Sequence, residues 1–403
     1  RFAICGDCAD ALRVFKLRRA NSLKCFMGGQ PALIIPHVHS GEPTTQLQEL
    51  VRNVFEERGR DVVASENRLL RALAGSEKLL VFHILWATVG QDLDDVRGFL
   101  TDVPSTRLRE LSTINKDITK RWNGAAPQSG RSVFPKHLLR ELDLGLDLFN
   151  EVLKHPGGKK EKSRNQGELR GALLRKIVGA VYTGHRMDDR RLWAEILSIA
   201  RAYLTDASAD ARHASTLWQE VQPREGKAMW LTAAGWVRHV AFFLHYLRTL
   251  EVLDMSKEPY QPKSELLAPY FTEGSGLDTK DKAFAFLLGL LLGKLMKTQA
   301  ARHVNVHANA LSWLRRGTLA GRDLPELYAK VRQKLLEYNV EASSQVREVV
   351  KEISRIGFMQ GTAIGLDGPR AMYFLLLGQA LVDDILPPKT KKTNDVKSQE
   401  DTK

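Results

Sequence analysis

The residues best suited to metal chemistry stand close to the start of the chain. Cys5 and Cys8 are separated by two residues in the stretch RFAICGDCAD. Two thiolates at this spacing typically supply half of a tetrahedral zinc site, and a second Cys or His pair supplies the other half. Cys25 is the one further cysteine in the sequence. We therefore expect the remaining ligands to lie upstream of residue 1, which makes the chain the C-terminal part of a longer protein.

A zinc ion held in this way would be structural, because four thiolates leave no open coordination position for a substrate. Gly6, between the two cysteines, suits the tight turn of such a knuckle. Two alternatives stay open: Cys5 and Cys8 are ordinary thiols, or His37 and His39 complete the site. The sequence thus predicts one structural zinc ion, incomplete within this chain.

A second feature is the surplus of positive charge. The chain has a net charge of +13 and a pI near 9.6, which favours a polyanionic partner such as nucleic acid or an acidic membrane surface. No Asp or Glu occurs between Ala283 and Arg322. We predict that this stretch tracks a phosphate backbone, and the alternative is a solvated basic face. The predicted nucleic-acid-binding residues are Lys294, Lys297, Arg302, Arg315, Arg316 and Arg322.

A third candidate is the R-x4-H pair formed by Arg302 and His307. One class of helical RNA-cleaving domains uses such a pair, with His as the acid/base and Arg on the phosphate. The motif is short and arises easily by chance, so an ordinary helix-surface pair is the alternative. The sequence contains no Walker A loop, GxSxG or HExxH motif. We predict that the chain is not an enzyme and keep Arg302 and His307 as the alternative.

The elements that must position these residues indicate an α+β chain. Short apolar runs predict strands over 32–35, after a Gly-Gly turn, and over 78–89, with a helix over 44–75. A loop or second strand follows, with a helix beginning near Ser105 at a plausible N-cap. The predicted fold is a small zinc-knuckle and β-containing N-terminal portion, then a predominantly helical region that ends in a C-terminal helical bundle.

From residue 135 onward the apolar periodicity is helical almost throughout. The predicted helices are 137–153, 169–183, 189–205, 227–253, 279–300, 302–316, 324–338, 343–358 and 369–385. The motif FLLG at 286–289 recurs as FLLLG at 374–378. Because glycine lets a neighbouring backbone approach closely, we expect these two helices to pack on each other in the core.

Changes in composition suggest six segments. They are 1–39 (half knuckle and strand), 40–134 (the rest of the N-terminal region), 135–254 (helical), 255–276 (linker), 277–388 (C-terminal bundle) and 389–403 (disordered charged tail). A Gly-rich loop is predicted over 155–168. The apolar run at 283–293 is too short to span a bilayer, which needs ~20 residues. We expect a soluble cytoplasmic protein without a membrane partner.

Several segments, in this order, resemble the large subunit of the subtype I-B CRISPR Cascade surveillance complex, which belongs to the eighth Cas protein family. The N-terminal part of the resemblance is FAICGDCADALRVFKLRRANSLKCFMGGQPALIIPHV, followed by LLVFHILWATVGQDLDDVRGFLTDVPSTRLREL. Near the C-terminus it is carried by FAFLLGLLLGKLMKTQA and LDGPRAMYFLLLGQALVDDI. The resemblance runs from residue 1 to about residue 386. It rests on the order of these segments, since no single motif is diagnostic.

The resemblance implies a non-catalytic subunit in antiviral defence. Its partners would be crRNA, the Cascade backbone subunits and target DNA, with a helicase-nuclease recruited separately. The C-terminal bundle would contact the displaced strand, and a region upstream of this chain would read the protospacer-adjacent motif. Some relatives also make the bundle as a separate small subunit, for which Met255 is the best placed start. The alternatives are a helical ribonuclease and a stand-alone basic nucleic-acid-binding protein.

Overall fold

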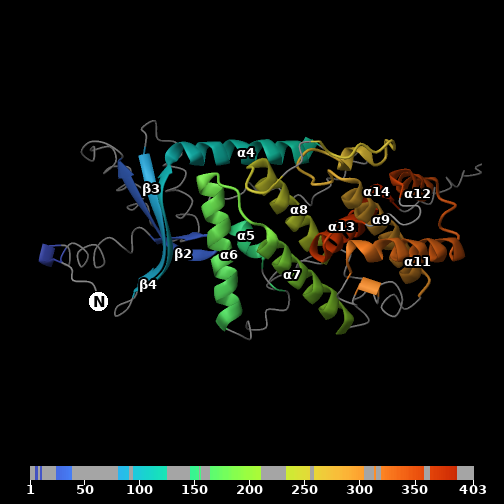
Figure 1. Cartoon of the computed structure of the whole chain (residues 1–403), viewed down its shortest axis with the longest axis horizontal. Coiled ribbons are helices and arrows are strands. Elements are labelled where there is room, and N and C mark those ends of the chain that lie inside the picture. Colours follow the sequence, from blue (N-terminus) through green and yellow to red (C-terminus); the bar gives the residue numbers. More distant parts are fainter. Residues whose placement is uncertain are drawn as a thin grey trace, which may run out of the picture.

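A four-stranded antiparallel sheet stands at one end of the computed structural model, and a body of helices extends away from it (Figure 1). The structure describes residues 5–7, 10, 24–38, 80–89, 94–124, 146–153, 155, 164–209, 233–254, 258–303, 313–314, 319–357 and 364–387. The predicted α+β class with a helical C-terminal region is confirmed. The helix predicted over 44–75 and the tail over 389–403 lie outside the described residues.

The described elements keep the order expected from the sequence. The strands are β1 (Lys24–Met27), β2 (Gln30–Val38), β3 (Leu80–Val89) and β4 (Asp94–Pro104). The first helices are α4 (Ser105–Gly124), α5 (Asp147–Val152), α6 (Arg164–Thr183), α7 (Arg190–Ala209) and α8 (Ala233–Thr249). The later ones are η5 (Ala268–Tyr270), α9 (Lys280–Ala301), η6 (Gly321–Asp323), α11 (Leu324–Glu337), α12 (Ser344–Ile356), α13 (Gly368–Ala380) and α14 (Val382–Ile385).

Side chains alternate between the two faces of a strand, which places the buried residues Ile34, Phe82, Ile84 and Trp86 together on one face of the sheet. The strands pair in the order β1-β2-β3-β4. Ile34 lies opposite Ile84, and Pro36 opposite Phe82. The predicted Gly-Gly turn joins β1 to β2, with φ values of 58° at Gly28 and 70° at Gly29, a conformation that glycine adopts without strain. Helix α6 packs on this face, where Phe82 meets Tyr182 edge-on at 6.0 Å between ring centroids.

Several predicted boundaries differ from the structure: the strand predicted over 32–35 is longer, since β2 runs over Gln30–Val38, and the helix predicted over 227–253 ends at Thr249. Helix α6 begins at Arg164, so the loop predicted through residue 168 is wrong over its last five residues, where the charged sequence is helical. The helix predicted over 369–385 is interrupted at Leu381, between α13 and α14. Helix α4 begins at Ser105, as predicted.

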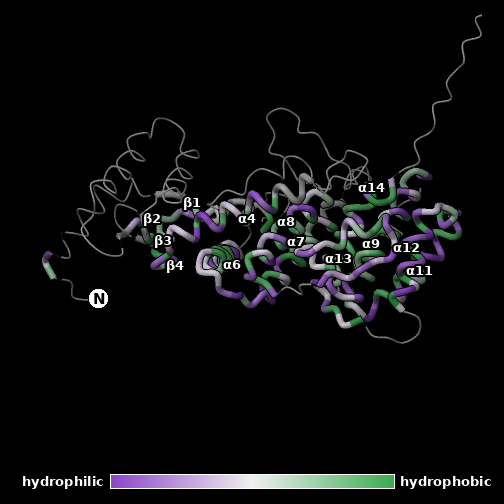
Figure 2. Tube along the Cα trace, turned by 90° about the horizontal axis from the view of Figure 1, so that it is seen from above, coloured by the Kyte–Doolittle hydropathy of each residue, from purple (hydrophilic) through white to green (hydrophobic). Residues whose placement is uncertain are grey.

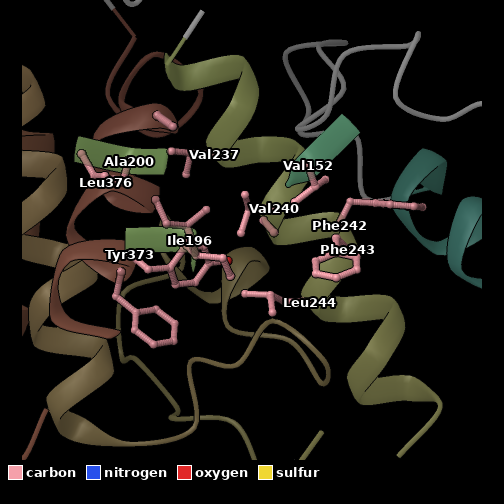
Figure 3. Packing of buried hydrophobic residues seen from close by; sticks show 14 of the residues in the cluster. Val152, Ile196, Ala200, Val237, Val240, Phe242, Phe243, Leu244, Tyr373 and Leu376 are labelled. Atoms are coloured by element: carbon pink, nitrogen blue, oxygen red, sulfur yellow. The ribbon is translucent and has the colours of Figure 1, made fainter. Parts of the chain in front are cut away.

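The core of the helical body is built around the aromatic side chains of α8. Trp236, Phe242, Phe243 and Tyr246 are all buried. Figure 3 shows how side chains of α8 meet Ile196 and Ala200 of α7 and Tyr373 and Leu376 of α13. Figure 2 shows α9 and α11 to α14 gathered at the end of the molecule opposite the sheet.

Helices α9 and α13 pack against each other, as the repeated FLLG motif predicts. A Cβ at Gly289 would collide with the carbonyl oxygen of Leu375, and one at Gly378 would collide with the carbonyl oxygen of Phe286. The two backbones therefore touch where each motif has its glycine. Helix α9 is long and apolar enough to cross a membrane, but 78% of its most apolar 18-residue stretch is buried inside the protein. Burial by α11, α12 and α13 together accounts for its apolar sequence.

The described part of the segment predicted as a linker, residues 258–276, crosses the helical body, and we call it the strap. The Tyr260 hydroxyl donates to Glu352 Oε1 of α12 at 2.8 Å. The guanidinium of Arg248 donates to the carbonyl oxygens of Gly274 and Ser275 at 3.3 and 3.2 Å. The strap is thus held to α12 at one end and to α8 at the other. The division into the predicted domains stays a prediction.

Candidate nucleic-acid interface

The first two predicted phosphate-binding residues lie on α9 and contact other parts of the chain. Lys294 is half-buried, and its Nζ donates to the carbonyl oxygen of Leu386 at 3.3 Å. Burial, together with the charge of nearby Lys297, lowers the pKa of Lys294. Lys297 forms an ion pair with Asp383 of α14. Both lysines help to hold α14 on α9, so their ammonium groups already have partners within the chain.

Arg302 is exposed and follows the last residue of α9. Its guanidinium donates to the carbonyl oxygen of Tyr338 at 2.9 Å, and its Cζ lies 4.9 Å from the centroid of the Tyr338 ring. Arg302 therefore ties the end of α9 to the end of α11 by a hydrogen bond and a cation–π contact. Arg302 is exposed to solvent despite these contacts.

Arg322 is highly exposed, with 82% of its side chain accessible. Its nearest acidic partner is Asp323, at 3.9 Å between Nε and Oδ1. Arg315, Arg316 and His307 lie outside the described residues. Because His307 is not described, its distance from Arg302 is not defined. The catalytic alternative therefore stays a prediction, and so does the phosphate-binding strip.

Sequence reasoning missed the ion-pair partners of the acidic pair in α14. Asp383 pairs with Lys297, and Asp384 accepts from Arg238 of α8 at 2.5 Å. Arg238 also donates to the carbonyl oxygen of Ala380, the last residue of α13. The signal available in the sequence was the pair of aspartates directly after an apolar helix. The partners could not be found because they lie 86 or more residues away.

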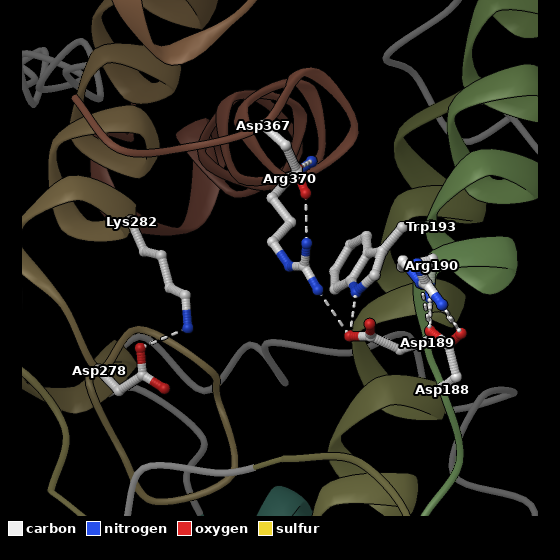
Figure 4. Close-up of polar contacts among 8 residues, drawn as sticks. All are labelled: Asp188, Asp189, Arg190, Trp193, Asp278, Lys282, Asp367 and Arg370. Carbon is white, nitrogen blue, oxygen red and sulfur yellow. Dashed lines mark hydrogen bonds and ion pairs between the residues drawn. The ribbon is translucent and has the colours of Figure 1, made fainter. Parts of the chain in front are cut away.

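A polar junction joins the first turn of α7 to the start of α13 (Figure 4). Arg370 Nη2 donates to Asp189 Oδ2 at 2.7 Å, and the same carboxylate oxygen accepts from Trp193 Nε1 at 2.7 Å. The Arg370 guanidinium lies over the Trp193 ring, 5.2 Å from its centroid, and pairs with Asp367 at the N-cap of α13. Lys282 of α9 pairs with Asp278 nearby. These contacts fasten helices that are far apart in sequence.

Arg248 and Tyr373 lie buried beside this junction. Burial lowers the pKa of the Arg248 guanidinium and raises the pKa of the Tyr373 hydroxyl to about 12. The Tyr373 oxygen makes no hydrogen bond within the described residues. The charged side chains drawn in Figure 4 pair with groups of opposite sign, so the arrangement stabilises the helix packing.

The predicted zinc ligands fall mostly outside the described structure. Cys5 is exposed, and Cys8 and His39 lie in parts of the chain that the structure does not describe. Among the described residues, no three His, Cys, Asp or Glu side chains lie close enough to hold a metal ion. The zinc knuckle therefore stays a prediction.

Comparison with known proteins gives one family. A family model described as the C-terminal domain of CRISPR-associated protein TM1802 matches residues 149–386. The match covers more than half of the chain and includes nearly all of α5, the helices from α6 to α14, the strap and the polar junction. No curated protein matches the sequence.

Proposed function

We propose that this chain, which belongs to the CRISPR-associated TM1802 family through its C-terminal domain, is a non-catalytic large subunit of a crRNA-guided surveillance complex. It binds target DNA and stabilises the displaced strand while the guide RNA pairs with the other strand. The observation that carries the proposal is the family match over residues 149–386. The order of segments that resembles the subtype I-B large subunit supports the finer assignment.

The charge of the chain supports a nucleic-acid partner. A protein with a net charge of +13 attracts the phosphate backbone of a nucleic acid whatever its base sequence, and such binding weakens with added salt. We propose that the contacts lie around the acid-free stretch 283–322, in whose described parts Arg302 and Arg322 are exposed. Lys294 and Lys297 act mainly by holding α14 to α9.

Binding of target DNA by the assembled complex tests this proposal. The affinity for a DNA target should be measured at several salt concentrations, for the unaltered complex and for one that carries Arg315→Gln, Arg316→Gln and Arg322→Gln together. Removing three phosphate contacts should reduce the slope of log K against log salt by about 2–3. Lys330→Gln on α11, whose partner is Glu326, is the control and should leave the slope unchanged. An unchanged slope in the triple variant would place the DNA elsewhere.

The alternative function is a helical ribonuclease that uses Arg302 and His307. It requires cleavage of labelled RNA by the isolated chain, and loss of cleavage in His307→Ala. Under our proposal the isolated chain is inert in this assay. Cleavage that disappears with His307→Ala would replace the proposal with the ribonuclease.

A further inference from the structure

Strand β4 displays two large apolar side chains to solvent. Phe99 is 73% exposed and Val96 is 56% exposed. They are two of five large hydrophobic residues that are exposed among the described residues, and a third, Phe26 of β1, belongs to the same sheet. Scattered exposed hydrophobic residues need no explanation, but several on one face mark an interaction site.

A β-bulge places Phe99 and Val96 on the same face. Residues three apart in a regular strand point to opposite faces. Here Val96 lies opposite Ala87, whereas Gly98 lies opposite Trp86, so Arg97 is the extra residue of a bulge. Phe99 then lies opposite Leu85, two residues from Ala87 on β3. Bulges redirect side chains and are common at sheet edges.

The same register extends across the sheet to β1. Leu85 lies opposite Leu33 of β2, and Phe26 lies opposite Pro31, two residues before Leu33. Phe26, Val96 and Phe99 therefore share the face that points away from α6. We call the part of this face formed by Val96 and Phe99 the β4 patch. Strand β4 is at the edge of the sheet, so a partner can reach the patch from the side.

Charge distinguishes the kinds of partner that fit the β4 patch. Strand β4 contains three aspartates and one arginine, a net charge of −2 in a chain of +13. Acidic surroundings repel the phosphates of DNA and RNA and attract basic groups. Asp102 is described and exposed on the same strand. The bulge also interrupts the regular ladder that an added strand would need, so side chains must carry the contact.

We propose that the β4 patch docks a protein partner through a basic segment that places an apolar side chain against Phe99. The partner is a protein subunit of the complex, and in this respect the inference rests on the proposed function. The proposed nucleic-acid contacts lie at the other end of the molecule, around α9 and η6, so the two surfaces are separate. A single exposed aromatic side chain at the centre of such a contact can dominate its affinity.

Assembly of the complex tests the inference. The full chain carrying a tag should be purified from cells that express the whole operon, and the protein subunits that accompany it should be quantified. Phe99→Asp should lower their yield at least ~10-fold, as expected for a central aromatic contact, and Phe99→Trp should retain it. The matched control is Leu336→Asp, because Leu336 is 57% exposed on α11. Far-UV circular dichroism of the isolated variants verifies folding.

A photo-crosslinker identifies what the patch touches. Benzoylphenylalanine at position 99 should attach to a peptide of a protein subunit with net positive charge, and the same group at position 336 should not. Attachment to crRNA or DNA, or full assembly of Phe99→Asp, would overturn the docking inference while leaving the proposed function intact. A wild-type chain that purifies without RNA and without other subunits would overturn both.

Discussion

Two glycines show how a single missing side chain shapes this molecule. Gly289 of α9 and Gly378 of α13 each face the backbone of the other helix, with no room for a Cβ. Glycine weakens an isolated helix by about 0.5–1 kcal/mol relative to alanine, so both positions have a cost in helix formation. Close packing of the two apolar helices offsets this cost.

Alanine at either position should destabilise the protein. Gly289→Ala and Gly378→Ala each push a methyl group into a carbonyl oxygen, and overpacking of this kind costs about 1–3 kcal/mol or more. Gly179→Ala in α6 is the matched control, because a Cβ added there would have no neighbouring atom within 4 Å, and it should be neutral or stabilising. Urea denaturation measures the three free energies of unfolding. Equal effects at all three positions would contradict the packing described for α9 and α13.

Tyr373 makes the stability of the protein sensitive to alkaline pH. Burial raises the pKa of its hydroxyl to about 12, whereas an unfolded tyrosine ionises near ~10. The unfolded chain therefore releases this proton first, and the folded state loses on the order of 2–3 kcal/mol of stability as pH rises from 10 to 12. Because its oxygen makes no hydrogen bond in the described structure, Tyr373→Phe should be nearly neutral at pH 7.

Thermal unfolding at a series of pH values measures this effect. The melting temperature of Tyr373→Phe should fall less steeply between pH 10 and pH 12 than that of the unaltered chain. Parallel curves for the two proteins would show that Tyr373 ionises at its ordinary pKa, and that its hydroxyl is reached by water.

Among the elements, the strap differs most from its prediction as a linker. Three prolines and many polar residues over 255–276 are typical of a linker. In the structure Leu267 and Phe271 of this segment are buried, and the ring of Phe271 meets that of Phe286 on α9 at 5.6 Å. Irregular backbone can pack as tightly as a helix when specific side chains anchor it, and such anchors leave no periodic pattern to find.

Regular elements were predictable because their patterns repeat. Strand β3 is dense in β-branched and aromatic residues, and α9 carries a long apolar run, so both were found near their observed bounds. The polar contacts were not predictable. Arg370 and Asp189 are 181 residues apart, and no local periodicity links them. For the same reason the bulge at Arg97 could not be foreseen, since it appears only when β4 is paired with β3.

Release of the strap should follow from the loss of Glu352. This buried carboxylate accepts from the Tyr260 hydroxyl, from the backbone N–H of Lys263 and from Arg355. Glu352→Leu removes all three contacts, so amide hydrogen exchange should accelerate over 258–267 while α9 and α13 stay protected. Glu348→Leu is the graded comparison, because it removes a single described strap contact, with Ser264, and should accelerate exchange less than Glu352→Leu. Unchanged exchange in Glu352→Leu would mean that apolar contacts alone hold the strap.

The whole molecule carries its charge unevenly. Most of α9 belongs to the acid-free stretch 283–322, whereas strand β4 carries three aspartates and one arginine. These two elements lie far apart along the long axis (Figure 1). We infer that the end with α9 contacts nucleic acid and that the end with β4 contacts protein. The polar junction and the strap fix the arrangement of the helices that lie between these two ends.

The measurement that tests the central claim most directly is the sequence of the RNA that purifies with this protein. The full-length gene should be tagged in its native operon, and the protein purified at moderate salt. Our account predicts short RNAs of uniform length, each with one constant repeat-derived part and a variable spacer. A preparation without RNA, or with a random mixture of cellular RNAs, would contradict the assignment to a crRNA-guided complex.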